Sequence, residues 1–71
     1  MWNLQGMQVK GIYLGDIPVA GKVTLSRVCY GGGVSHHIEL DEAFDAGYGN
    51  IRRDAGEVVI VDHKDITEVR D

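Results

Sequence analysis

Hydrophobic and polar residues alternate along most of this chain, which is the pattern of β-strands with one face in a core. The alternation is clearest in residues 7–14 (MQVKGIYL), 19–29 (VAGKVTLSRVC) and 34–40 (VSHHIEL). Residues 57–62 (EVVIVD) are apolar on both faces, which favours a central or doubly covered strand, and residues 66–70 (ITEVR) predict a last short strand. No stretch has a helical period, so the predicted fold class is all-β.

A first hairpin follows if residues 15–17 form a loop between the first two strands. That loop places Val9 opposite Val23 and Gly11 opposite Gly21. Two facing glycines weaken a flat sheet, but they allow strands to bend sharply where a small barrel turns a corner. The sequence therefore predicts a strongly curved sheet at this point.

A second hairpin follows if residues 31–32 form a two-residue glycine turn, since such turns need positive φ. It places Leu25 opposite Ile38 and Val23 opposite Leu40. Both hairpins independently direct Val23 and Leu25 inward. A one-residue slip would send the apolar set outward, so this agreement is the strongest structural signal in the sequence.

The second half of the chain is less regular. Residues 41–50 are irregular and rich in glycine, and residues 54–56 (DAG) read as a three-residue turn that places Ile51 against Val59. Residues 62–65 (DHKD) predict one tight turn, of the 3₁₀ type, before the last strand. Five to six short strands of this kind predict a small SH3-like barrel or a strongly bent antiparallel sheet, the latter completed by dimerisation.

Length limits how the chain is stabilised. The 71 residues are expected to form a single small β domain, 1–71, in which residues 1–6 are either a first strand or a flexible arm. A core of this size supplies only about 3–5 kcal/mol, so such domains often depend on disulfides, metals or self-association. One cysteine cannot form an internal disulfide and metal ligands are scarce, which leaves self-association as the favoured support.

Composition and charge restrict the partners and the compartment. Seven basic residues face eleven acidic ones, a net charge of −4, which disfavours non-specific binding to nucleic acid. No apolar run approaches the roughly 18 residues of a membrane span, and the N-terminus lacks the pattern of a secretory signal. With a single unpaired cysteine, the expected compartment is the reducing cytoplasm.

The cysteine and the histidines are the first candidates for chemistry. Cys29 and His36 fall on the same predicted face, so a Cys–His nucleophile is conceivable, but no orienting group accompanies them. The favoured interpretation is a small buried cysteine. Adjacent His36 and His37 point to opposite faces, and with His63 they lack the spacing of a zinc site. We therefore expect no metal, cofactor or catalytic residue.

Arg27 is the second candidate, because the predicted register directs it toward His36 on the apolar side of the hairpin. A charge there must be paired or must reach water, which indicates a barrel mouth or an interface. Together with Tyr30, the two side chains would line a small polar pocket or an intersubunit contact. The alternative is a local bulge that turns Arg27 outward and brings Val28 and Tyr30 inward.

Two charged clusters complete the candidates. The acidic residues 41, 42 and 45 fit a solvated loop, since their spacing does not match a calcium site. Arg52 and Arg53 beside Tyr48 are the one feature that resembles a nucleic-acid surface, although ordinary solvated charge with an Arg53–Glu57 pair is favoured. The residues expected to form an interaction rim are Arg27, Tyr30, His36, Tyr48, Arg52 and Arg53.

Several short motifs spread over most of the chain resemble a known type of sequence. They are Trp2-Asn3-Leu4, Tyr13-Leu14-Gly15, Ser26-Arg27-Val28, Tyr30-Gly31-Gly32, His37 and Leu40-Asp41. This pattern is similar to that of short hypothetical proteins from bacteriophages and other mobile elements, including integron gene cassettes. The resemblance implies a compact β protein of phage or mobile-element origin, and it provides no catalytic residues.

The expected function is non-enzymatic binding, to a protein partner or through self-association as a homo-oligomer, because a small acidic β domain offers edge strands to partners. The alternative is an SH3-like nucleic-acid-binding module that uses Arg52, Arg53 and nearby aromatic side chains. A third hypothesis is an enzyme built from Arg27, Cys29 and His36 across an oligomer interface.

Overall fold

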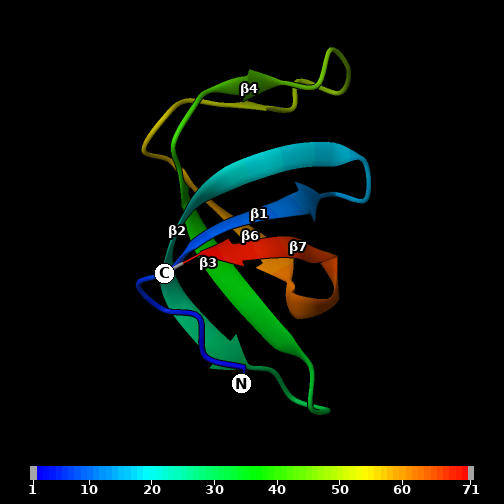
Figure 1. The fold of residues 1–71 in the computed structure, drawn as a ribbon. Helices are drawn as coiled ribbons and strands as arrows, with labels where there is room; N and C mark the ends of the chain where they lie inside the picture. The colour runs from blue at the N-terminus through cyan, green and yellow to red at the C-terminus, as the bar shows by residue number, and fades with distance from the viewer. Residues whose placement is uncertain (1, 71) are drawn as a thin grey trace.

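The computed structural model describes residues 2–70, whose regular elements are β-strands and one 3₁₀ turn, which confirms the predicted all-β class (Figure 1). The 3₁₀ turn expected near residues 62–65 is also present. The elements in chain order are β1 (Gln8–Tyr13), β2 (Ile17–Val28), β3 (Val34–Leu40), β4 (Phe44–Asp45), β5 (Arg52–Arg53), β6 (Val58–Asp62), the 3₁₀ turn η1 (His63–Asp65) and β7 (Ile66–Arg70).

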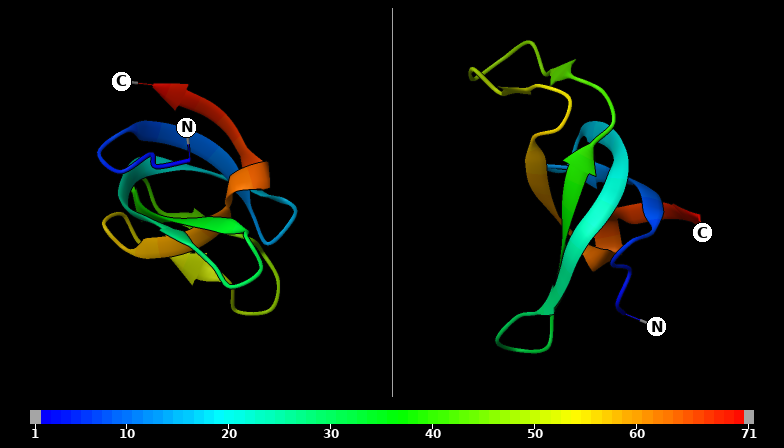
Figure 2. Two further views of the ribbon diagram at one scale, coloured as in Figure 1. Left: turned by 90° about the horizontal axis from the view of Figure 1, so that it is seen from below. Right: turned by 90° about the vertical axis from the view of Figure 1, so that its left-hand side faces the viewer.

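Five of the strands form one antiparallel sheet in the order β6-β3-β2-β1-β7, and β4 pairs separately with β5. The long strand β2 bends, so the sheet curls and brings β1 near β6 across its concave side (Figure 2). Among the described residues no ladder joins β6 to β7, and the sheet does not close into a barrel. Both β6 and β7 are therefore edge strands.

The hydrophobic core fills the concave side of the curled sheet. Val23 and Ile38, from β2 and β3, are completely buried. Leu4 is also buried, and its backbone N–H donates to Ser26 Oγ over 3.0 Å, so the N-terminal segment is held against β2. The buried apolar residues are Leu4, Val9, Ile17, Val19, Val23, Ile38, Leu40, Val59 and Val61.

The first hairpin turns one residue earlier than predicted, at residues 14–16 and not at 15–17, so its register differs by two residues. Val9 pairs with Gly21 and Gly11 with Val19, and the predicted pairs Val9–Val23 and Gly11–Gly21 are wrong. The tight turn is possible because Leu14 adopts a positive φ of 54°, followed by a glycine that tolerates the same region. A shift of two residues keeps every side chain on its predicted face.

The second hairpin has a longer turn than predicted, closed by a hydrogen bond from Cys29 N to Gly33 O of 2.6 Å. This turn shifts the register by one residue, and a bulge between Val23 and Leu25 shifts it by another. Val23 consequently stays in the core as predicted and pairs with Ile38. Leu25 lies within the reversed stretch and is 43% exposed, so its predicted inward orientation is wrong.

Two glycines lie where backbones approach closely. A Cβ on Gly21 would be 2.1 Å from the carbonyl oxygen of Glu39, and one on Gly11 would be 3.0 Å from the carbonyl oxygen of Asp65. The curl of the sheet thus excludes a Cβ at residue 21 and leaves little room for one at residue 11. Both glycines lie in the curved part of the sheet, as predicted, although they do not face each other.

The segment before β6 also differs from the prediction. The turn at residues 54–56 is present, with Glu57 N donating to Asp54 O over 3.1 Å. However, β5 pairs with β4 and not with β6, so the predicted contact of Ile51 with Val59 across one hairpin is wrong. Glycines at positive φ in residues 47–49 let the chain return on β4, which forms a separate hairpin.

Candidate functional site

The six residues predicted to form an interaction rim do not lie together. Arg27 and Tyr30 lie at the end of the β2–β3 hairpin, whereas Tyr48 and the pair Arg52–Arg53 belong to the β4–β5 hairpin at the opposite end of the molecule (Figures 1 and 2). His36 is completely buried in the interior. The structure therefore separates them into two exposed groups and one core residue.

Arg27 follows the alternative considered for it. The bulge in β2 turns Arg27 outward, where it pairs with Ser35 instead of His36. The same alternative expected Val28 and Tyr30 to turn inward, and this part is wrong: Val28 is 53% exposed and Tyr30 lies fully exposed in the turn. The hairpin end extends beyond the core, so both faces of its last residues reach solvent.

The buried His36 lies at the centre of a chain of hydrogen-bonded polar side chains that reaches the exposed His63. Its Nδ1 atom is 2.7 Å from Ser26 Oγ, and its Nε2 atom is 2.8 Å from His63 Nδ1. Ser26 Oγ also accepts the backbone N–H of Leu4. The chain thus connects the N-terminal segment, β2, β3 and η1, four parts of the fold that are distant in sequence.

The electrostatics of this chain favour a neutral imidazole. Burial lowers the pKa of His36 below the ordinary value for histidine, and the neighbouring His63 lowers that pKa further. A serine beside a histidine resembles a nucleophile with its base. Here, however, Ser26 is itself buried and its oxygen already accepts the N–H of Leu4. The hydrogen-bonded row Ser26–His36–His63 therefore serves to link parts of the fold.

The Cys–His nucleophile considered from the sequence is not formed, as the favoured interpretation expected. Cys29 Sγ lies 3.3 Å from Ser35 Oγ, which in turn donates to Asp62 Oδ1 over 3.5 Å. His36 instead contacts Ser26 and belongs to the opposite face of β3. Within residues 2–70, no three His, Cys, Asp or Glu side chains are grouped to hold a metal ion.

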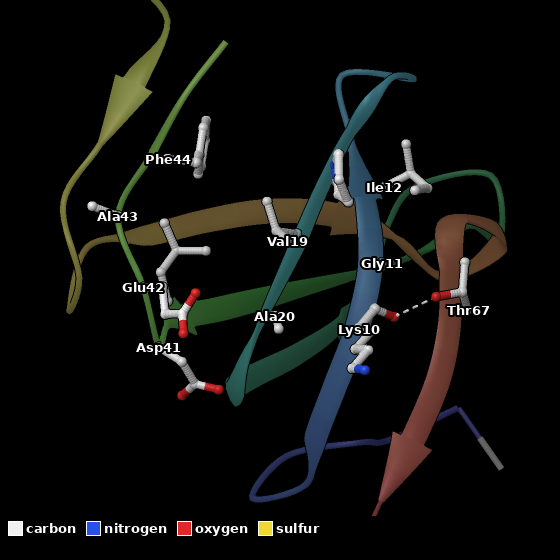
Figure 3. A pocket seen from close by; sticks show the side chains of 12 residues that line it. Lys10, Gly11, Ile12, Val19, Ala20, Asp41, Glu42, Ala43, Phe44 and Thr67 are labelled. Carbon is white, nitrogen blue, oxygen red and sulfur yellow. Dashed lines mark hydrogen bonds between the residues drawn. The ribbon is translucent and has the colours of Figure 1, made fainter.

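A shallow groove of about 480 Å³ lies between the outer face of β1 and β2 and the segment that leads into β4 (Figure 3). Lys10, Asp41 and Glu42 lie at one end of the groove, and Phe44 lines its other end. Asp41 accepts a hydrogen bond from Gln8, and this charged end is exposed to solvent. The groove offers charges of both signs and does not select one ligand class.

Two contacts made by aromatic side chains hold the β4–β5 hairpin against the β1–β2 hairpin. Tyr13 and Phe44 pack edge to face with ring centroids 5.9 Å apart. The hydroxyl of Tyr48 donates to both carboxylate oxygens of Asp16, at 2.9 and 2.8 Å, and this hydrogen bond raises the pKa of Tyr48. Tyr48 is thus engaged within the fold and does not form a platform with the two arginines.

Exposed apolar side chains lie side by side on the outer face of β2, β3 and β6. Leu25 pairs with His37, and His37 pairs with Ile60 on β6, so the three side chains form one row across three strands. Ile60 is 54% exposed and Val58, two residues away on the same face, is 48% exposed. We call Leu25, His37, Val58 and Ile60 the outer apolar patch.

Polar residues flank this row on both of its sides, in the neighbouring positions along the strands. On one side Glu39 pairs with Val58 and with Lys22, and on the other side Ser35 pairs with Arg27 and Asp62. An apolar centre within a polar border is the usual anatomy of a protein–protein interface.

Sequence reasoning missed this patch for an identifiable reason. The run EVVIVD is apolar on both faces, and it was expected to be a covered strand. In the structure β6 is an edge strand that buries Val59 and Val61 and leaves Val58 and Ile60 uncovered. The apolar run shows that both faces of β6 favour burial, but it does not show which part of this chain or of a partner buries the outer face.

Neither a search for membrane-spanning helices nor comparison with known proteins identifies a function for this chain. No helix in the described part of the chain has the length and apolar character needed to cross a membrane. Comparison with protein-family models, with curated proteins and with solved structures finds no match for this chain. The functional argument therefore depends on the geometry described above.

Proposed function

We propose that this chain is a small, non-enzymatic β interaction protein that binds another protein through the outer apolar patch. One observation carries the proposal: Val58 and Ile60 are about half exposed, beside an exposed Leu25, in a run whose composition is that of a covered strand. Isolated apolar side chains on a surface are common, but a contiguous patch with a polar border indicates an interaction site.

The proposal also includes the type of fold, the cellular compartment and the origin of the protein. We infer an SH3-like arrangement, in which β6, η1 and β7 follow a curled sheet, and a cytoplasmic protein of phage or mobile-element origin. The curled sheet and the order of its strands support the first inference. The sequence motifs Tyr13-Leu14-Gly15 and Tyr30-Gly31-Gly32, together with the single cysteine, support the others.

A protein partner is favoured over nucleic acid by the surroundings of the two arginines. Arg52 lies opposite the acidic Asp45 in the register of the β4–β5 hairpin, and the guanidinium of Arg53 donates to the carbonyl oxygen of Arg52. With Asp54 adjacent and a net charge of −4, this strip offers little uncompensated positive charge to phosphates.

Site-specific photo-crosslinking in the host cell tests the proposal. A benzophenone side chain in place of Leu25 is expected to give one covalent adduct with another protein. The same group in place of the exposed Glu42, outside the outer apolar patch, is expected to give none. Adding Ile60→Lys should abolish the Leu25 adduct. Identical adduct patterns at Leu25 and Glu42, or a Leu25 adduct that persists with Ile60→Lys, would contradict the proposal.

A further inference from the structure

Strand β6 lies at an edge of the five-stranded sheet. We propose that a second copy of this chain pairs its own β6 with this edge, antiparallel and with Ile60 on the two-fold axis, so that two five-stranded sheets become one continuous ten-stranded sheet. The inference deepens the proposed function and rests on it in one respect: the second copy continues the outer apolar patch beyond β6 and so enlarges the surface to which a protein partner binds.

The backbone of β6 shows which residues offer hydrogen bonds to a partner. Leu40 N donates to Glu57 O, so Glu57 directs its carbonyl toward β3. Because successive residues of a strand direct their backbone groups to alternate sides, Val58, Ile60 and Asp62 direct theirs to the free edge. Three residues thus present unpaired N–H and C=O groups in a row, which is a template for another strand.

The space beside this edge is open. A hollow of about 410 Å³ separates Ile60 and Asp62 from Ile12 and Leu14 at the β1–β2 turn. Leu14 is 58% exposed there. A strand added to β6 enters this hollow, and its side chains cover Leu14 together with the edge residues.

The sequence of β6 is complementary to itself in the proposed register. With Ile60 opposite Ile60 of the second copy, Val59 lies opposite Val61 and Val58 opposite Asp62 of that copy. The acidic Glu57 then meets the first residues of η1 of the second copy, where His63 and Lys64 provide basic groups. In a two-fold interface each such contact occurs twice.

Charge complementarity at the ends of the strand matters because each chain carries a net charge of −4 and two copies repel each other. The register centred on Ile60 places unlike charges together at both ends of the paired strands. It also keeps Asp62 away from the carboxylate of its counterpart. Local attraction therefore opposes the overall repulsion and selects one register.

The other edge strand has the features that prevent pairing. On β7, the carboxylate of Glu68 lies 3.8 Å from Lys10 of the neighbouring β1 and 3.2 Å from Arg70, so the second half of this edge strand carries charged side chains. Charged residues are the usual protection of exposed edges. By contrast, β6 has four consecutive apolar residues, from Val58 to Val61, and no charge among them.

Pairing at β6 also extends the surface available to a further protein. The row formed by Leu25, His37 and Ile60 continues across the two-fold axis into the same three residues of the second copy. The dimer therefore presents one apolar row across six strands. A single chain presents only half of it.

Sedimentation equilibrium of the purified chain is the first test. The chain is expected to show a monomer–dimer equilibrium with a limiting mass twice that of one chain. Ile60→Pro removes the N–H at the axis without removing a bond to β3, whereas Ile60→Ala keeps the N–H. The dimer dissociation constant should therefore rise at least tenfold more with Ile60→Pro than with Ile60→Ala. Equal values for the two variants would contradict edge pairing.

Disulfide cross-linking tests the register and does not depend on the proline variant folding. In a Cys29→Ser background with oxidised glutathione, Ile60→Cys is expected to give a covalent dimer. At the axis the two Cα atoms lie about 5.5 Å apart, within disulfide range. Val58→Cys is the matched control, equally exposed on the same strand. Its two copies lie four residues out of register, roughly 14 Å apart, and should not cross-link.

The outcomes separate this inference from the proposed function. Mixing Val58→Cys chains with Asp62→Cys chains should restore cross-linking, because these positions face each other in the proposed register. A monomer at millimolar concentration, a larger oligomer formed by β6 with β7, or equal cross-linking at positions 58 and 60 would each overturn the inference. A photo-adduct of Leu25 with another protein would survive all three results, since Leu25 lies two strands away from the edge.

Discussion

Ser26→Ala is expected to destabilise the protein severely, because the hydroxyl satisfies two buried groups at once. It accepts the backbone N–H of Leu4 at 3.0 Å and contacts Nδ1 of His36 at 2.7 Å. Leaving a buried polar group without a partner costs about 1–3 kcal/mol, so the two together cost about 2–6 kcal/mol. The core of so small a domain supplies only about 3–5 kcal/mol, so the variant should be largely unfolded or close to it.

Urea denaturation followed by far-ultraviolet circular dichroism measures this loss. The matched control is Ser35→Ala. Ser35 is nearly as buried, but its hydroxyl makes only the longer contacts to Cys29 Sγ and Asp62 Oδ1, at 3.3 and 3.5 Å. The control should lose less than about 1 kcal/mol. A Ser26→Ala loss as small as that of Ser35→Ala would refute the view that the buried chain is a required link.

Two further predictions concern pH and backbone packing. Because the pKa of His36 is lowered in the folded chain, the unfolded chain binds more protons below about pH 6.5, and stability should fall as the pH drops through that value. Urea midpoints at pH 7.5 and 5.5 should differ less in His36→Gln than in the unaltered chain; equal differences would contradict the assignment. Gly21→Ala should abolish folding, because its Cβ would lie 2.1 Å from the carbonyl oxygen of Glu39, whereas Gly33→Ala meets open space and should change stability by less than about 0.5 kcal/mol. Circular dichroism of both variants checks this, and a folded Gly21→Ala protein would show that the strands separate more easily than their packing indicates.

Much of the fold was predictable because alternation reports directly which face of a strand is buried. Val9, Val23 and Ile38 were predicted to be inward, and all three are among the most buried residues of the structure. The 3₁₀ turn was predictable from the polar run DHKD between two apolar strands. These features depend on local sequence, so no knowledge of distant contacts was needed.

The pairing partners were less predictable because they depend on turn lengths. One additional residue in the β2–β3 turn reverses the orientation of the β2 side chains between that turn and the bulge. The bulge between Val23 and Leu25 then restores the predicted orientation in the rest of β2. The reversed stretch carries Leu25, Ser26 and Arg27. A bulge costs little in a curled sheet and leaves no distinct mark in a pattern of alternating residues.

The candidate site was predicted only in part, for the same reason. The sequence paired His36 with Arg27 or Cys29, whereas the bulge brings Ser26 to His36. His63 completes the chain from η1, 27 residues away, and no local pattern connects the two histidines. The six predicted rim residues do not form one surface, because His36 is buried and the other five belong to two hairpins at opposite ends of the molecule (Figure 1).

By itself, the sequence determined that this chain forms short antiparallel strands with one apolar side, that glycine lies where the sheet curls, and that the run EVVIVD is apolar on both faces. Only the tertiary structure decided which residues meet across the sheet and that β6 lies at an open edge with Ile60 exposed. The physical reason is that burial preference is a property of each residue. Register and edge position are properties of the whole sheet, and single-residue shifts in turns and bulges control them.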